Sequence, residues 1–506
     1  MKSFALASVC GCCALLASAQ IPSEGFNREL LSAREYELNN WKISEHQTLQ
    51  PAARGLEPGY YALTDTSYSA RAYRREINFV PVVDLSAGGQ PSPEVRGIGW
   101  GVLGVRAEWN YENRWTASLG AAVAGGALPG YVNDMADSIR VIPGWGYVRR
   151  DGDIRYTPVY TGHIGYKAGK YFHLEAGNGV HFWGDGRRSL ILSDVASPFP
   201  YFKVDTRIWR IRYTNIWARM EDIHGERSFR DRRGKYVAMH GLSWNLSRDV
   251  NITFFEMVVW QDRDSLSRRT IDFHYLNPVL FYRPVEYAQG SADNVIMGLS
   301  FRVKAKRNLQ VYGQLVLDEF LSTEIRARRG WWANKFGGQA GVKWFNAFTP
   351  GLHIQAEVNA VRPFTYTHGS PVQAWGHLNQ PLAHPMGANF FEFLLALRYQ
   401  RGKWNFSEIA TWANYGRDIP GLNQGGNIFQ SYRNPSERFY NSLNQGIRHI
   451  FHYQQFQVSR PLGGGRFEGF ASYTTRYEEG GGTIRLDHLF LVGIRTSGFL
   501  RNQLDF

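Results

Sequence analysis

The chain has 506 residues, 43% of them hydrophobic and 15% aromatic, and its 57 Lys and Arg against 44 Asp and Glu give a formal net charge of +13. Its mean hydropathy of −0.36 is ordinary for a soluble protein, and no stretch offers the eighteen or so apolar residues that a spanning helix needs. A transmembrane β-barrel is consistent with both facts, because only every second residue of a strand faces lipid. A large β-rich carbohydrate-binding protein is the soluble alternative.

The first nineteen residues have the pattern of a secretory signal. Lys2 gives a positive start, residues 4–16 form a short apolar core, and Ala17-Ser18-Ala19 is a small-residue cleavage site that leaves Gln20 as the mature end. The cysteines of the chain are Cys10, Cys12 and Cys13. We therefore expect a signal peptide at 1–19 and a mature chain with a net charge of +12, no cysteine and no disulfide.

The mature chain divides into two parts by pattern. Residues 20–55 include a stretch with helical character at 27–38, and Pro51 stops any continuation of a helix. We expect these residues to form a short periplasmic-side segment with short helices. Residues 56–506 are expected to form the barrel. The terminal Phe506 fits the aromatic end that the barrel-assembly machinery usually recognises, so this machinery is an expected partner.

Two-residue alternation is the main signal for strands. Residues 105–111 alternate apolar with polar side chains, a polar turn follows at 112–114, and residues 115–121 alternate again. The same alternation recurs in further segments: 209–214, 352–359, 391–397, 404–408 and 467–473. The polar face is rich in Arg, Glu, Gln and Asn, which a wet lumen tolerates and lipid does not. The length predicts about 14–18 antiparallel strands, with a long loop at 416–446.

The most distinctive segment covers residues 177–194 and reads Gly-Asn-Gly-Val-His-Phe-Trp-Gly-Asp-Gly-Arg-Arg-Ser-Leu-Ile-Leu-Ser-Asp. His181 and Asp185 are a possible acid/base pair, and Arg187 and Arg188 can hold a phosphate or carboxylate. We predict these four residues as ligands of an acidic polysaccharide. The structural alternative is a loop that folds inward and pairs its charges with the barrel wall.

A basic run from 207 to 235 follows this segment. Within it, Arg210 and Arg212 are further predicted polysaccharide ligands, because an arginine-lined lumen or rim attracts acidic sugars. Pairing across strands with Glu221, Glu226 and Asp231 is the alternative. Nucleic acid is not an expected partner of an exported chain, whereas lipopolysaccharide and outer-membrane lipid are.

Catalytic and metal-binding signatures are absent from the sequence. It contains no GxSxG nucleophile elbow, no HExxH and no P-loop. His449 and His452 are three residues apart on an expected strand, which places them on opposite faces. We predict no enzymatic activity, no metal and no cofactor.

The segment at 177–194, with residues 201–220 after it, resembles the Wzi family of capsule-assembly proteins, and more closely the RemB-type proteins associated with gliding motility in Bacteroidetes. Further similar stretches are Tyr275-Leu-Asn-Pro-Val-Leu-Phe-Tyr-Arg-Pro-Val-Glu286, Gly313-Gln-Leu-Val-Leu-Asp-Glu-Phe320, Trp331-Trp-Ala-Asn-Lys335, Val361-Arg-Pro-Phe-Thr-Tyr366 and Pro381-Leu-Ala-His-Pro-Met-Gly-Ala-Asn389. The resemblance covers most of the mature chain. It implies a barrel of the cell outer membrane without enzymatic activity, which holds capsular polysaccharide at the surface or serves surface motility. It supplies no ligand residues.

The sequence thus predicts an all-β outer-membrane barrel for polysaccharide attachment, capsule assembly or motility. A porin-like channel is the first alternative function, and an outer-membrane hydrolase is the second.

Overall fold

The computed structural model describes residues 49–50, 76–91, 96–112, 114–224, 232–263, 272, 274–276 and 293–496. Within them, eighteen antiparallel strands close into one barrel, which confirms the predicted fold class and the upper end of the predicted strand number. The signal at 1–19, most of the segment at 20–55 and the terminal Phe506 lie outside the described residues. Of that segment, Leu49–Gln50 (β1) is described, and it pairs with Phe182–Trp183 (β10).

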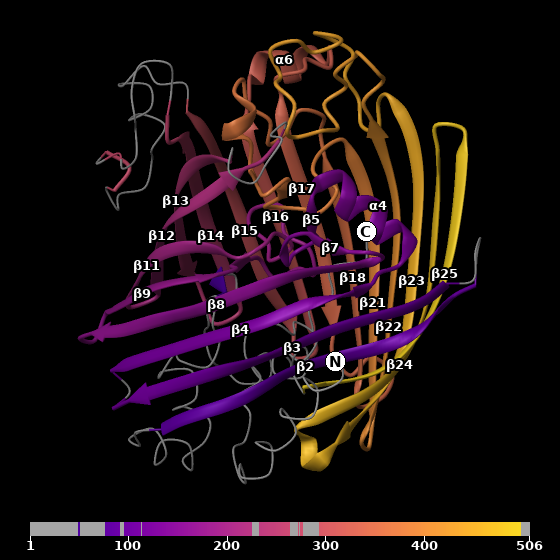
Figure 1. Cartoon of the computed structure of the whole chain (residues 1–506). Coiled ribbons are helices and arrows are strands. Elements are labelled where there is room, and N and C mark those ends of the chain that lie inside the picture. The colour runs from indigo at the N-terminus through magenta and orange to yellow at the C-terminus, as the bar shows by residue number, and fades with distance from the viewer. Residues whose placement is uncertain are drawn as a thin grey trace.

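The wall is a continuous antiparallel ladder in chain order (Figure 1). Its strands are β2 (Glu76–Gln90), β3 (Arg96–Tyr111), β4 (Trp115–Ala127), β8 (Ile154–Ala168), β9 (Phe172–Gly179), β11 (Phe199–Ile208), β12 (Ile211–Asp222), β13 (Arg233–Asn245), β14 (Val250–Gln261), β15 (Asn294–Lys306), β16 (Leu309–Glu319), β17 (Lys335–Trp344), β18 (Leu352–Val361), β21 (Phe390–Arg401), β22 (Trp404–Arg417), β23 (Ile447–Leu462), β24 (Phe467–Gly480) and β25 (Thr483–Thr496). The first and last strands close the barrel, with Asp84 opposite Arg495 and Gly89 opposite Phe490. Closure removes the free edges that an open sheet would expose.

The smaller elements belong to the connections. They are α4 (Gly130–Ile139), β5 (Val141–Ile142), β6 (Gly146–Tyr147), β7 (Arg149–Asp151), β10 (Phe182–Trp183), α6 (Ser322–Ala327), η3 (Pro371–Gln373), β19 (Gly376–His377), β20 (Gln380–Pro381) and η4 (Gly463–Gly465). No helix in the described part of the chain is both long and apolar enough to cross a membrane.

The predicted alternation matches the observed strands, with one correction. The hairpin of β3 and β4 turns at residues 112–114, as predicted, and on β18 the polar Glu357 and Asn359 are buried on the lumen side. Trp209 and Arg210, which we expected on a strand, instead form the turn between β11 and β12. Trp209 has a φ of 55°, a left-handed conformation that reverses the chain and is incompatible with a strand.

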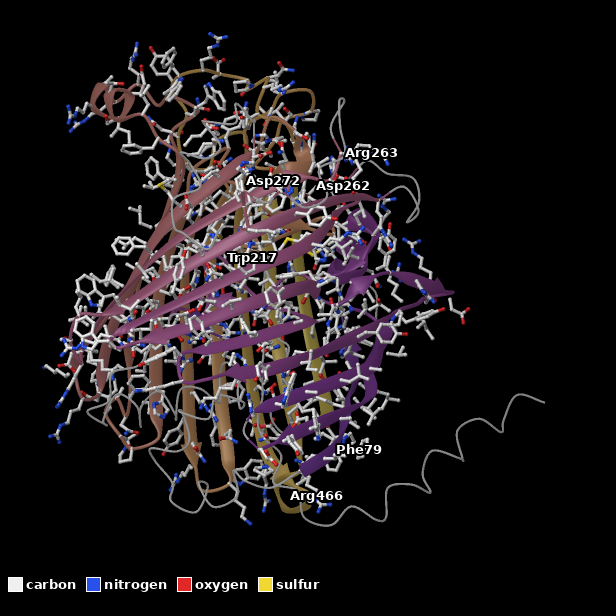
Figure 2. The ribbon with its side chains drawn as sticks, turned by 90° about the vertical axis from the view of Figure 1, so that its left-hand side faces the viewer. Phe79, Trp217, Asp262, Arg263, Asp272 and Arg466 are labelled. Atoms are coloured by element: carbon white, nitrogen blue, oxygen red, sulfur yellow. The ribbon has the colours of Figure 1, made fainter. Side chains whose placement is uncertain are left out.

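The two ends of the barrel differ in the length of their connections. One end carries the start of β2, the end of β25 and short turns such as 169–171, 246–249 and 402–403. The other end carries long connections that include 128–153, 180–198, 362–389 and 418–446. In outer-membrane barrels the periplasmic turns are short and the extracellular loops long. The short-turn end is therefore the periplasmic end; Arg466 marks it in Figure 2, opposite Asp262 and Arg263 at the extracellular end.

The outer surface of the wall is apolar, as a lipid-facing surface must be. Leu119, Phe254 and Phe490 are among the exposed large apolar side chains of the strands, and Phe79 and Trp217 also lie on this surface (Figure 2). Several exposed aromatic rings gather at the periplasmic turns: Trp115, Tyr171, Trp209, Trp244, Phe348 and Trp404. Rings of this kind sit at the membrane–water interface. The protein is accordingly an outer-membrane β-barrel.

Candidate functional site

The connection between β9 and β11, residues 180–198, folds into the lumen, and we call it the inward segment. Leu190, Ile191 and Leu192 within it are fully buried, in one apolar cluster with lumen-facing residues of β12 to β16. Trp183 belongs to the same cluster and its ring stacks on Phe255 at 5.2 Å between centroids. The apolar half of the distinctive sequence motif therefore forms a core inside the barrel.

Two glycines of the inward segment allow it to lie against the wall. A Cβ on Gly184 would come within 2.4 Å of the Gln314 side-chain nitrogen, and a Cβ on Gly186 within 2.4 Å of a Glu357 carboxylate oxygen. Real side chains do not approach this closely. The glycines that made the motif recognisable are thus required by close backbone approach to β16 and β18.

Glu357 on β18 accepts hydrogen bonds from the backbone of the inward segment. The N–H groups of Arg187 and Arg188 donate to its two carboxylate oxygens at 2.8 and 3.1 Å, and the Tyr312 hydroxyl donates at 2.8 Å. The Asn359 amide also donates to this carboxylate at 2.9 Å. A buried carboxylate with this many donors is fully satisfied, so it holds the backbone of the inward segment in place.

Glu392 on β21 pairs with the side chain of Arg188 in the inward segment. Arg188 Nε lies 3.3 Å from one carboxylate oxygen, and both side chains are almost completely buried. The other oxygen lies 2.7 Å from His384 Nε2 and accepts from the Asn359 amide at 2.9 Å. Arg188 and Glu392 are therefore a buried ion pair that joins a connection to the wall.

Further bonds fix the inward segment on its other sides. Gln314 on β16 accepts from the Leu190 N–H at 2.7 Å and donates to the Trp183 carbonyl at 2.9 Å. The connection 362–389 covers the segment, because the Tyr366 hydroxyl and the Trp375 indole N–H donate to the carbonyls of Leu190 and Ile191. Two connections far apart in the sequence thus form one plug in the lumen.

The opposite wall carries a second internal cluster. Tyr131 and Val132 of α4 pack against Val102 on β3, Val159 on β8 and Leu489 on β25. The helix lies inside the outline of the wall near these strands in Figure 1. Described connections therefore pack into the lumen from two sides.

The structure brings together four of the six predicted ligand residues. His181, Asp185, Arg187 and Arg188 all lie in the inward segment, and only Arg187 keeps a partly exposed side chain. Asp185 lies 3.5 Å from Arg302 on β15, with both side chains buried. His181 and Asp185 have separate neighbours, since His181 packs against the Tyr201 ring at 4.4 Å.

The other two predicted residues lie apart from this group. Arg212 faces the lumen on β12 and its Nε bonds the Asp205 carboxylate at 2.8 Å, with both groups buried. Arg210 is exposed in the β11–β12 turn at the periplasmic end and donates to the Leu246 carbonyl at 3.2 Å. The six residues therefore do not form one surface.

Burial controls the protonation of His181. Its side chain is 1% exposed, and burial, with Lys203 as a nearby positive charge, lowers its pKa from 6.5 to about 3. The unfolded state therefore takes up a proton between these pH values that the folded state does not. Stability contributed by neutral His181 is complete above about pH 6.5 and is lost as the pH falls towards 3.

We expect His181→Leu to flatten the decline of the unfolding free energy between pH 6.5 and 4, measured by urea unfolding in detergent. His377 in β19 is also buried with a pKa lowered to about 3, so part of the decline should persist. His452→Leu, at an exposed position on β23, is the control for removing a histidine as such. An identical slope in His181→Leu and the parent would contradict the assignment.

Sequence reasoning missed the residues that hold the inward segment, three on the wall strands and His384 in the connection 362–389. Gln314, Glu357, His384 and Glu392 were not selected, although Glu357 belongs to the polar face of a recognised alternating strand. The useful signal was the presence of carboxylates on an expected lumen face, which require buried partners. Within the described ranges, no group of three or more His, Cys, Asp or Glu side chains is placed to hold a metal ion.

The comparisons with known proteins agree with this architecture. No protein-family model and no curated protein matches the chain. Among solved structures, it is similar to Wzi of Escherichia coli, described as an outer-membrane protein involved in group 1 capsule assembly and a carbohydrate-binding β-barrel. The TM-score is 0.56 at 12% identity, over 93% of this chain and 99% of Wzi. OpdK of Pseudomonas aeruginosa matches with a TM-score of 0.46 at 8% identity, over 83% and 98% of the chains. OccAB2 of Acinetobacter baumannii matches with a TM-score of 0.45 at 10% identity, over 83% and 97%. At these identities, the similarity to Wzi establishes the shared fold.

Proposed function

We propose that the protein is a non-enzymatic outer-membrane barrel that attaches or helps to assemble polysaccharide at the cell surface. The observation that carries this proposal is a plug inside the lumen: a connection from the extracellular end is bonded to the wall through Glu357, Glu392 and Gln314. A barrel closed in this way presents a rigid external surface. The Wzi fold supports the proposal, because the description of Wzi names capsule assembly and carbohydrate binding.

The particular ligands and partners belong to the same proposal. Polysaccharide binding by His181, Asp185, Arg187, Arg188, Arg210 and Arg212 stays a prediction, as do contacts with lipopolysaccharide and the barrel-assembly machinery. A motility-linked role of the RemB type is a variant of the proposal, since it would use the same external surface.

The test is a comparison of cells with and without the protein. We expect the deletion strain to release surface polysaccharide into the medium, and the parent gene to restore retention. Spreading on soft agar, measured in the same strains, separates the motility variant. Unchanged polysaccharide retention in the deletion strain would overturn the attachment role.

A porin-like channel is the second candidate, and the size of the barrel favours it. Barrels of sixteen to eighteen strands are wide enough to enclose an aqueous channel, and this one has eighteen. Its lumen wall also carries charged pairs such as Arg106 with Glu108 and Arg495 with Glu468. Single-channel recording in planar bilayers decides between the two: the plug inside the lumen predicts small or absent currents, and large steady currents would support the porin.

A further inference from the structure

The extracellular connections carry a group of arginines that differs from those inside the barrel. Arg326, Arg328, Arg433 and Arg438 have exposed side chains, and none is in an ion pair with another residue of the described chain. The lumen arginines Arg188, Arg212 and Arg302, by contrast, are buried beside carboxylates. These four arginines can therefore offer positive charge to an external anion.

Backbone hydrogen bonds join the connection 320–334, which contains α6, to the connection 418–446. The N–H groups of Tyr440 and Asn441 donate to the carbonyls of Arg329 and Gly330 at 2.7 and 2.9 Å, and the Trp332 N–H donates to the Arg438 carbonyl at 3.0 Å. These bonds place Arg438 and Tyr440 beside the C-terminal end of α6. In Figure 1, α6 and the neighbouring connection form the top of the barrel.

The Arg362 side chain stabilises these two joined connections through hydrogen bonds. Its guanidinium donates to the carbonyls of Asn334, Trp331 and Asn441 at 2.8, 3.4 and 3.4 Å, so a single side chain links three segments. Trp332 packs between Phe364 and Tyr432, with ring centroids 5.7 and 5.3 Å away. The contacts therefore hold the backbone that carries the arginines in place before any ligand binds. This lowers the entropic cost of binding.

An exposed aromatic ring accompanies the charges. Tyr440 is 87% exposed, with a φ of 63° fixed by the bonds to the α6 connection. An exposed ring of this kind offers an apolar face with a polar tip. We call Arg326, Arg328, Arg433, Arg438 and Tyr440 the crown patch. Its acidic surroundings are limited: Glu324 pairs with Arg329, and Glu437 is exposed.

Resting on the proposed function, we propose that the crown patch is the binding site for an acidic polysaccharide. The arginines bind sugar carboxylates, because a guanidinium matches a carboxylate with two parallel hydrogen bonds. The Tyr440 ring stacks on the apolar face of a sugar. Each exposed contact is weak, so several must act together on one chain, and salt must weaken the charged ones.

The test measures binding of purified full-length protein to polygalacturonate, an acidic probe, and to dextran, a neutral one. A variant with all four arginines changed to Gln should bind polygalacturonate at least about tenfold more weakly at low salt, and the difference should shrink at high salt. Tyr440→Ala should weaken binding several-fold at every salt concentration, because stacking is not screened.

The control removes the same charge from the other end of the barrel. Lys170, Arg248, Lys403 and Arg466 are exposed in the periplasmic turns, and changing all four to Gln should leave binding unchanged. Heat-modifiable gel migration establishes that each variant is folded.

Three outcomes would overturn the crown patch: parental affinity in the arginine variant, an equal loss in the control, or equal binding of the parent to both probes. None of them decides the proposed function, which the polysaccharide-retention assay tests independently. Retention lost in the deletion strain but kept with the arginine variant would reject this site and keep the function.

Discussion

Glu392→Ala should destabilise the barrel by about 3–5 kcal/mol, the usual cost of removing one partner from a buried ion pair. The Glu392 carboxylate is 0% exposed and bonds Arg188, His384 and Asn359. Its removal takes a carboxylate partner away from the buried Arg188 guanidinium. Urea unfolding of the protein in lipid vesicles, followed by tryptophan fluorescence, measures the change.

The matched control is an exposed pair of the same chemistry. Glu324 lies 2.5 Å from Arg329, whose side chain is 54% exposed. Glu324→Ala should cost roughly 0–1 kcal/mol, because water screens the pair and solvates each partner alone. Equal effects of the two substitutions would show that the Arg188 pair does not hold the plug to the wall.

Removing the plug should convert the barrel into an open channel. Gly179 pairs with Phe199, and Val361 pairs with Phe390, so each of the two plugging connections begins and ends at adjacent strand positions. Short Gly/Ser turns in place of residues 181–197 and 363–388 would therefore keep the strand register. The wall of eighteen strands should then enclose water beside α4, which stays in place, and planar-bilayer conductance should rise well above the parental currents.

The control for this experiment shortens a connection that does not fill the lumen. None of the residues of α6 is buried, so replacing residues 322–329 with a short turn should leave conductance at the parental level. A plugless barrel that folds, as judged by heat-modifiable migration, and still conducts no more than the parent would contradict the assignment of these connections as the plug.

The class of structure could be predicted from local sequence patterns. Alternation with a period of two, as in 105–111 and 352–359, is imposed on each strand separately by lipid on one side and polar groups on the other. It can be seen without knowing which strands are neighbours. The same local logic located the β3–β4 turn and the long loop after β22, and the glycines and charged residues of 177–194 marked that segment as distinctive.

The partners of the distinctive segment could be seen only in the folded structure. Whether Arg188 faces a ligand or a carboxylate depends on Glu392, 204 residues later in the chain, and the partner of Asp185 is Arg302. Such pairs follow from barrel closure and from the direction in which a connection folds, and no local pattern encodes either. The same holds for the crown patch, because α6 and the loop before β23 meet only through hydrogen bonds between residues more than a hundred positions apart.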